Sequence, residues 1–147
     1  SMTTKELQTG LVEKMKAWQE IEAASVSSTQ KIIEKSDNPL IKIAMEIIKR
    51  DSEMHSKVQD FIVGTFERKA VSLTPEEMAV IESSFAKHDE YERKMIAFVE
   101  EALGQIKGKK MLVQEYLLGY LLEDERKHAR LLEGLGKIQK GMYPYAS

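Results

Sequence analysis

The amino-acid sequence predicts an all-α fold, a single four-helix bundle. The chain has 147 residues but only three prolines and eight glycines, so few positions interrupt a helix. Apolar residues recur at spacings of three and four along four segments, as expected for one face of a helix. Residues typical of helix ends separate these segments, among them Pro39 and Pro75.

We expect one domain over residues 2–141 and a short tail over residues 142–147. Ser1 precedes Met2, and we interpret it as a residue added before the natural start. The chain is long enough to form one domain with a hydrophobic core of its own. The four helices are predicted over about residues 6–35, 39–66, 75–104 and 109–138.

The first two helices have recognisable start signals. Thr3 and Glu6 have the spacing of a capping box. Asn38 can cap the second helix, with Pro39 in the first helical position, where the missing N–H costs nothing.

Two alternatives stay open for the end of the second helix. Gly64 is a candidate C-terminal cap, so the helix ends somewhere between residues 63 and 68. An early end leaves residues 64–73, which can span roughly 34 Å at about 3.4 Å per residue, enough to run along a bundle. A late end leaves only a short turn.

The third helix begins with a cap, a proline and a capping-box glutamate at Thr74, Pro75 and Glu77. The fourth begins near Lys109, and glycines near its C-terminal end mark where it stops.

The apolar stripes of the four helices consist of Leu11, Met15 and Trp18; Ile41, Ala44, Ile48, Val58 and Ile62; Ile81, Phe85, Met95 and Val99; and Leu117, Leu121, Leu131, Leu135 and Ile138.

Composition excludes several function classes. The formal net charge of −2 and the absence of a basic cluster argue against nucleic-acid and membrane partners. The chain has no cysteine, which excludes disulfides, thiolate catalysis, Cys-ligated zinc and a rubredoxin-type iron centre. It also lacks a signal peptide and a long apolar run, so we expect a cytoplasmic protein.

Acidic and histidine side chains interrupt each apolar stripe near the middle of its helix. All three histidines of the protein take part. Buried carboxylates are costly unless they are paired, protonated or bound to a cation, and a cluster of them repels itself. Any single one is more often an ordinary core or boundary residue, but together they predict a metal site. Its expected ligands are Glu22, His55, His88, Glu92, Glu125 and His128.

The segment from Leu122 to Leu132 resembles the last helix of ferritin-like proteins, especially of the rubrerythrin branch. That family holds two irons with one glutamate from each of two helices and a Glu-x-x-His motif from each of the others. The resemblance implies that Glu22 and Glu92 match the single glutamates, that Glu125 and His128 form one motif, and that His55 belongs to the other. Asp51 and Asp124 match outer aspartates that each hold the histidine of the opposite motif.

One position departs from the family pattern. Ser52 stands where the motif ending in His55 should begin with a glutamate. Glu53 does not substitute for it, because it falls on a face expected to meet water, and Glu20, the alternative to Glu22 on the first helix, is set aside for the same reason. His88, one turn before Glu92, is the candidate replacement; otherwise the second metal position is weak or empty.

The resemblance implies a non-haem protein that binds one or two ions of iron, or alternatively manganese or another divalent metal. The resemblance also implies redox chemistry with oxygen or peroxide, with no catalytic residues besides the metal ligands and with electrons from an external donor. By analogy with the family, we expect a homodimer. The alternative is a non-catalytic ferritin-like bundle whose degenerate or single-metal site serves structure, metal binding or protein interaction. A scaffold without metal is the third reading.

Overall fold

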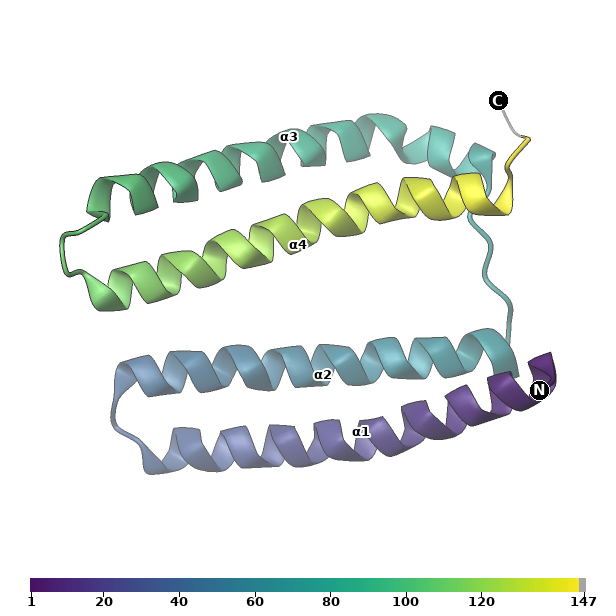
Figure 1. Ribbon diagram of the computed structural model, residues 1–147, viewed down its shortest axis with the longest axis horizontal. Helices are drawn as coiled ribbons and strands as arrows, with labels where there is room; N and C mark the ends of the chain where they lie inside the picture. The colour runs from purple at the N-terminus through teal and green to yellow at the C-terminus, as the bar shows by residue number, and fades with distance from the viewer. Residues whose placement is uncertain (146–147) are drawn as a thin grey trace. The chain divides into compact units, whose positions relative to one another are not determined.

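The computed structural model describes residues 1–145 and contains four α-helices (Figure 1). They are α1 (Thr4–Lys35), α2 (Pro39–Glu67), α3 (Pro75–Ile106) and α4 (Leu112–Met142). No residue in this described range lies in a β-strand. The predicted all-α fold with four helices is therefore confirmed. No helix in the same range is long and apolar enough to cross a membrane.

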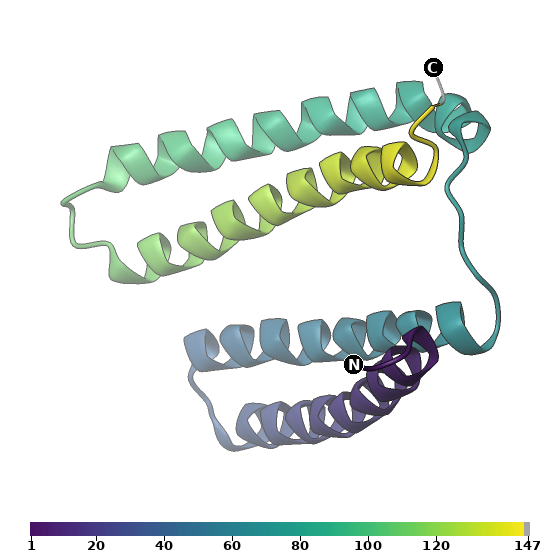
Figure 2. The ribbon, with the colours of Figure 1, turned by 45° about the vertical axis from the view of Figure 1, so that its right-hand side comes forward.

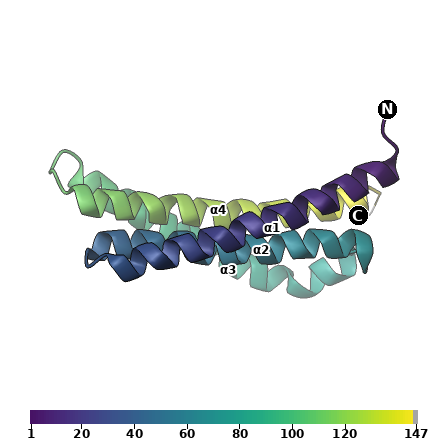
Figure 3. The same ribbon diagram turned by 90° about the horizontal axis from the view of Figure 1, so that it is seen from below.

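The chain forms two compact units, each a helical hairpin. The first, up to Val71, contains α1 and α2, and the second, from Ser72, contains α3 and α4. Figures 1 and 2 show that the two helices of each hairpin run side by side in opposite directions. Seen from below, α1 crosses α2 obliquely (Figure 3). The single bundle over residues 2–141 stays a prediction.

Side-chain caps lie at the start of three helices, at the predicted residues Thr3, Asn38 and Thr74, although α1 begins at Thr4 rather than near Glu6. Thr3 Oγ1 accepts a hydrogen bond from the Glu6 backbone N–H, with an N···O distance of 3.1 Å. Asn38 Oδ1 accepts two backbone N–H groups at the start of α2. At α3 the capping box is complete, because Thr74 Oγ1 accepts from the Glu77 N–H and the Glu77 carboxylate accepts from the Thr74 N–H. These bonds satisfy amide groups that a helix start leaves without internal partners.

The fourth helix differs from its predicted range at both ends. It begins at Leu112 rather than near Lys109, because Gly108 and Lys110 have φ values of 75° and 57°. Residues in this left-handed region cannot belong to a right-handed helix. The helix then continues past residue 138 to Met142. Of the predicted tail, residues 146 and 147 lie outside the described range.

The second helix continues through Gly64 to Glu67, with Arg68 as its C-cap. The alternative in which residues 64–73 form a long connection is therefore wrong. Gly64 instead makes room for Arg68, whose Nη2 would lie 2.7 Å from a Cβ atom at position 64. The guanidinium folds back there and donates to the backbone oxygen of Asp60.

The seam between the helices of each hairpin contains polar as well as apolar side chains. In the α1–α2 hairpin, Val12, Met15 and Val63 form a small apolar cluster at one level. In the α3–α4 hairpin, Val99 and Glu92 are buried. Two helices cover only one flank of each other, so stripe residues such as Trp18 and Leu121 stay 48% and 43% exposed. The buried polar side chains in each hairpin need hydrogen-bond partners.

Candidate metal centre

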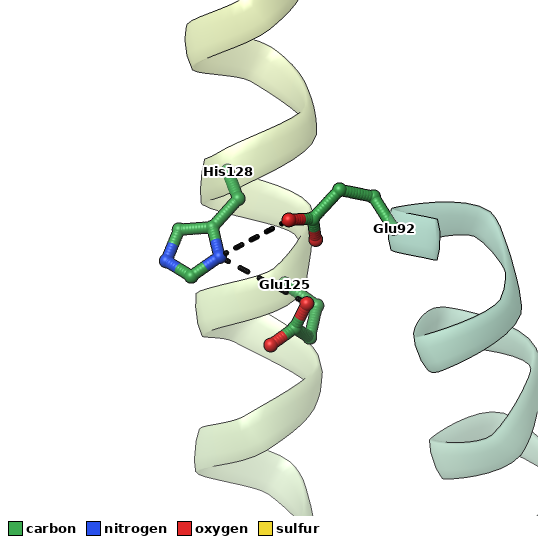
Figure 4. Close-up of side chains that lie close together, drawn as sticks. All are labelled: Glu92, Glu125 and His128. Atoms are coloured by element: carbon green, nitrogen blue, oxygen red, sulfur yellow. Dashed lines mark ion pairs between the residues drawn. The ribbon is translucent and has the colours of Figure 1, made fainter. Parts of the chain in front are cut away.

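Glu92, Glu125 and His128 form a compact group inside the α3–α4 hairpin (Figure 4). One ligand atom from each lies within 4.8 Å of the other two. His128 Nδ1 is 3.5 Å from Glu92 Oε1 and 3.9 Å from Glu125 Oε2. Figure 4 shows the imidazole and the two carboxylates turned toward one another. Within residues 1–145, this is the only group of three potential ligands that meets this distance limit.

Two features of the helices bring these side chains together. Glu125 and His128 are three residues apart on α4, so they occupy the same face on adjacent turns. Glu92 reaches them from α3 and is only 1% exposed. The group therefore combines a fully buried carboxylate with a pair whose spacing already suits one ion.

Two oxygen atoms of this group are buried without a hydrogen-bond partner. They are Glu92 Oε2 and Glu125 Oε2. A buried polar atom without a partner costs about 1–3 kcal/mol, and more if it is charged. A proton or a cation bound to these oxygens would offset this cost.

The two carboxylates also change each other's acidity. The pKa of Glu125 is raised, first because a proton on it can be shared with Glu92 and then because of burial. The pKa of Glu92 is lowered, chiefly because the protonated Glu125 stabilises its negative charge, although burial opposes this effect. Glu125 is therefore the carboxyl of the pair that takes up a proton more readily.

His88 lies at the edge of the group. Its Nε2 atom is 2.9 Å from Glu92 Oε1, the oxygen that His128 also approaches, so Glu92 Oε2 is left for another partner. The imidazole of His88 packs edge-on against the ring of Tyr91, with 6.3 Å between centroids. His88 therefore orients Glu92, and its own side chain is 53% exposed.

Asp124 contacts the other nitrogen of the His128 ring. Its Oδ2 atom is 3.3 Å from His128 Nε2, and its Oδ1 atom is 2.7 Å from Lys127 Nζ. An acceptor at Nε2 leaves Nδ1 available toward the carboxylates. The predicted pairs of Asp51 with His128 and of Asp124 with His55 join different hairpins and stay predictions.

The other two predicted ligands, Glu22 and His55, meet inside the α1–α2 hairpin. His55 Nδ1 is 3.0 Å from Glu22 Oε2 and donates to it, because a carboxylate only accepts. Glu22 is buried, whereas the His55 side chain is 58% exposed. The structure thus brings three predicted ligands together, with His88 beside them, and pairs two more in the first hairpin. Convergence of all six on one volume stays a prediction.

One partner of this second group, Gln59, was missed from the sequence. Gln59 is 3% exposed, and its Nε2 donates to Glu22 Oε2 over 3.1 Å. Ser52 is buried and shares a 2.9 Å hydrogen bond between hydroxyl groups with Ser25 of α1. Its position four residues after His55 places Gln59 on the same helical face, but only its contact with Glu22 of α1 shows its importance.

The exposure of two other acids agrees with the sequence analysis. Glu20 and Glu53 are both exposed, as predicted from the faces of their helices. Ser52 is therefore not replaced by a neighbouring glutamate of α2. The first hairpin has one carboxylate at this level, the buried Glu22, where the second has the buried Glu92 and the half-buried Glu125.

Comparison with known proteins adds no relative. No family model matches the chain, and neither a curated protein nor a solved structure matches it. The likeness to ferritin-like proteins therefore rests on the residues of this chain, above all on Glu125 and His128 and their place opposite Glu92.

Proposed function

We propose that this protein binds a divalent transition-metal ion through Glu92, Glu125 and His128. The observation that supports this most strongly is the pair of buried carboxylate oxygens without partners, beside an imidazole nitrogen. Carboxylate and imidazole are common ligands of iron, manganese and zinc, and a divalent ion offsets the charge of both acids. Bound at this place, the ion removes the cost of two incompletely paired acids.

The ferritin-like resemblance favours iron, with manganese as the alternative, and oxygen- or peroxide-linked redox chemistry. When bound, such an ion supplies the change of oxidation state, which no side chain of this chain offers. The side chains have three tasks: Asp124 orients His128, His88 orients Glu92, and burial of Glu92 limits access of water to the site. Electrons come from an external donor.

A second candidate function is a non-catalytic site with a single metal that stabilises the fold. The hydrogen bond between Ser52 and Ser25 favours it, because Ser52 occupies the position of a family glutamate and its hydroxyl is already paired. A single ion lacks the neighbouring metal on which dinuclear centres depend. Both functions share the same metal ligands, so they differ in reactivity rather than in where the ion binds.

Metal titration tests the proposal. Fe²⁺ under anaerobic conditions, and Mn²⁺ and Co²⁺ separately, should bind at one tight site per chain and raise the thermal unfolding midpoint. Glu92→Gln and Glu125→Ala should each remove this binding. Glu101→Gln and Glu123→Gln change exposed acids on the same two helices and serve as matched controls. Absence of tight binding by the natural chain would contradict the proposal.

Admission of oxygen then separates the two functions. A redox-active site should consume oxygen or peroxide when it is loaded with Fe²⁺, and Glu125→Ala should abolish the metal-dependent rate. A stabilising site should bind the ion and raise the unfolding midpoint without turnover. The measurement is oxygen uptake per chain, compared with free Fe²⁺ at the same concentration.

A further inference from the structure

The two hairpins contain similar polar groups whose partners differ in chemistry and in position along the helix. In the α3–α4 hairpin, a buried glutamate of α3 faces a glutamate and a histidine of α4. In the α1–α2 hairpin, Glu22 of α1 faces His55 and Gln59 of α2. The carboxylate partner in the second hairpin, Glu125, lies three residues before His128, whereas the partner in the first hairpin is an amide, Gln59, four residues after His55.

This difference changes how each buried glutamate is satisfied. Glu22 Oε2 accepts from both His55 Nδ1 and Gln59 Nε2, so two donors already surround it. In the second hairpin, Glu92 Oε2 and Glu125 Oε2 have no partner. One group is closed by internal hydrogen bonds, whereas the other lacks a proton or a cation.

We infer that Gln59 keeps the α1–α2 hairpin free of metal and thereby limits the chain to one ion, in the α3–α4 hairpin. This inference rests on the metal site proposed there. The amide Nε2 of Gln59 has no free lone pair for a metal, and it donates to Glu22 Oε2, the carboxylate oxygen that faces His55. The neutral amide also leaves this hairpin with one negative charge fewer to attract a hard cation.

The orientation of the Gln59 amide supports this role. Its Nε2 atom points at Glu22, while its buried Oε1 atom has no hydrogen-bond partner. Rotating the amide by half a turn would bring Oε1 against the Glu22 carboxylate, where two acceptors repel each other. The donor contact with Glu22 is therefore retained although it leaves Oε1 unsatisfied.

An isosteric substitution tests the inference. Gln59→Glu replaces the Nε2 atom, 3.1 Å from Glu22 Oε2, by a carboxylate oxygen of nearly the same size. It creates a set of two glutamates and one histidine, as in the α3–α4 hairpin. Glu125→Gln makes the opposite exchange and leaves the second hairpin with one carboxylate. The double variant moves the carboxylate pair from one hairpin to the other.

The experiment compares these four proteins with Co²⁺ as the probe. Bound Co²⁺ per chain is measured by titration calorimetry and elemental analysis, and the unfolding midpoint is measured with and without Co²⁺. We expect one ion in the natural chain, two in Gln59→Glu, none in Glu125→Gln and one in the double variant. His55→Ala in the Gln59→Glu background should return the count to one, which locates the new ion.

The outcomes separate this inference from the proposed function. Two ions in the natural chain, or one ion in a folded Gln59→Glu variant, would overturn the inference and leave the α3–α4 site standing. No ion in the natural chain but one in Gln59→Glu would reject the proposed function while supporting the role of Gln59. If Gln59→Glu does not fold, Gln59→His offers a neutral ligand beside Glu22 and His55 and should also gain one ion.

Discussion

Glu92 and Glu125 approach each other across the seam of the α3–α4 hairpin, and each keeps a buried Oε2 atom without a hydrogen-bond partner. A proton and a metal ion are alternative ways to satisfy this pair. Of the two carboxyls, Glu125 takes up a proton more readily, because its pKa is raised by its interaction with Glu92 and by burial. A metal ion that binds both carboxylates must displace this proton.

Metal binding should therefore release a proton and weaken as the pH falls. Below the raised pKa of Glu125, the ion competes with the bound proton, so the apparent affinity should decrease with each step toward lower pH. Calorimetric titration with Co²⁺ in two buffers of different ionisation enthalpy measures the protons released. An equal observed enthalpy in both buffers, at a pH where Glu125 is protonated, would contradict the competition.

The stability of the metal-free protein should fall as the pH rises above 4.5. Because the folded-state pKa of Glu125 is raised above its ordinary value of 4.5, its contribution is fully present below 4.5 and is lost as the pH rises through the raised pKa. Glu92 has the opposite sign: its pKa is lowered, so its contribution is present above 4.5 and is lost as the pH falls through the lowered pKa.

Urea unfolding on both sides of pH 4.5 measures this dependence. Glu125→Gln cannot titrate and should flatten the fall above 4.5, because the amide donates to Glu92 at every pH. Glu123→Gln, at an exposed position of α4, should retain the full dependence. Identical slopes for the natural chain and Glu125→Gln would show that the pair does not hold a proton.

Asp124 should matter for metal affinity although it is not expected to be a ligand. Its contact with His128 Nε2 fixes the ring so that Nδ1 faces the carboxylates. Asp124→Ala should therefore weaken Co²⁺ binding by roughly 10- to 100-fold, as loss of such outer partners usually does. The control is Lys127→Met, which removes the other contact of Asp124 and should change affinity little. Equal losses for both variants would indicate a general effect on α4.

Much of the fold could be read from local sequence signals. The starts of α2 and α3 follow from Asn38 and Thr74, since caps act within one turn. The start of α4 could not be read, because a lysine with positive φ at position 110 has no distinctive sequence signal. A helix start set by a neighbouring loop conformation is therefore one that the sequence misplaced.

For the site too, the sequence predicted the relations within one helix but not those between two helices. Glu125 and His128 share a face by their spacing alone, whereas the contact with Glu92 depends on the register between α3 and α4. Register is a property of two packed helices and is not contained in the spacing of either one. For the same reason Gln59 was missed: its importance arises only from Glu22 on the opposite helix.

The Ser25–Ser52 pair gives a second way to change the first hairpin. Ser52→Glu places a carboxylate three residues before His55, the spacing that Glu125 and His128 have on α4. Ser52 is only 4% exposed, however, and its hydroxyl pairs with Ser25, so the longer acid must displace this contact in a closely packed seam. We therefore expect the metal-free variant to be less stable than the natural chain by about 1–3 kcal/mol, the usual cost of overpacking.

Metal should reverse much of that loss. Ser52→Glu should bind a second Co²⁺ ion, more weakly than the first because the Gln59 amide still occupies Glu22 Oε2. Combining Ser52→Glu with Ser25→Gly removes the opposing hydroxymethyl group and should raise the second affinity, whereas Ser52→Gln has nearly the same size without the charge and should bind one ion only. The measurement is the ion count per chain together with the Co²⁺-induced shift of the unfolding midpoint. If Ser52→Glu and Ser52→Gln gave the same count, the missing carboxylate would not be what distinguishes the first hairpin from the second, and the amide of Gln59 would have to account for the difference alone.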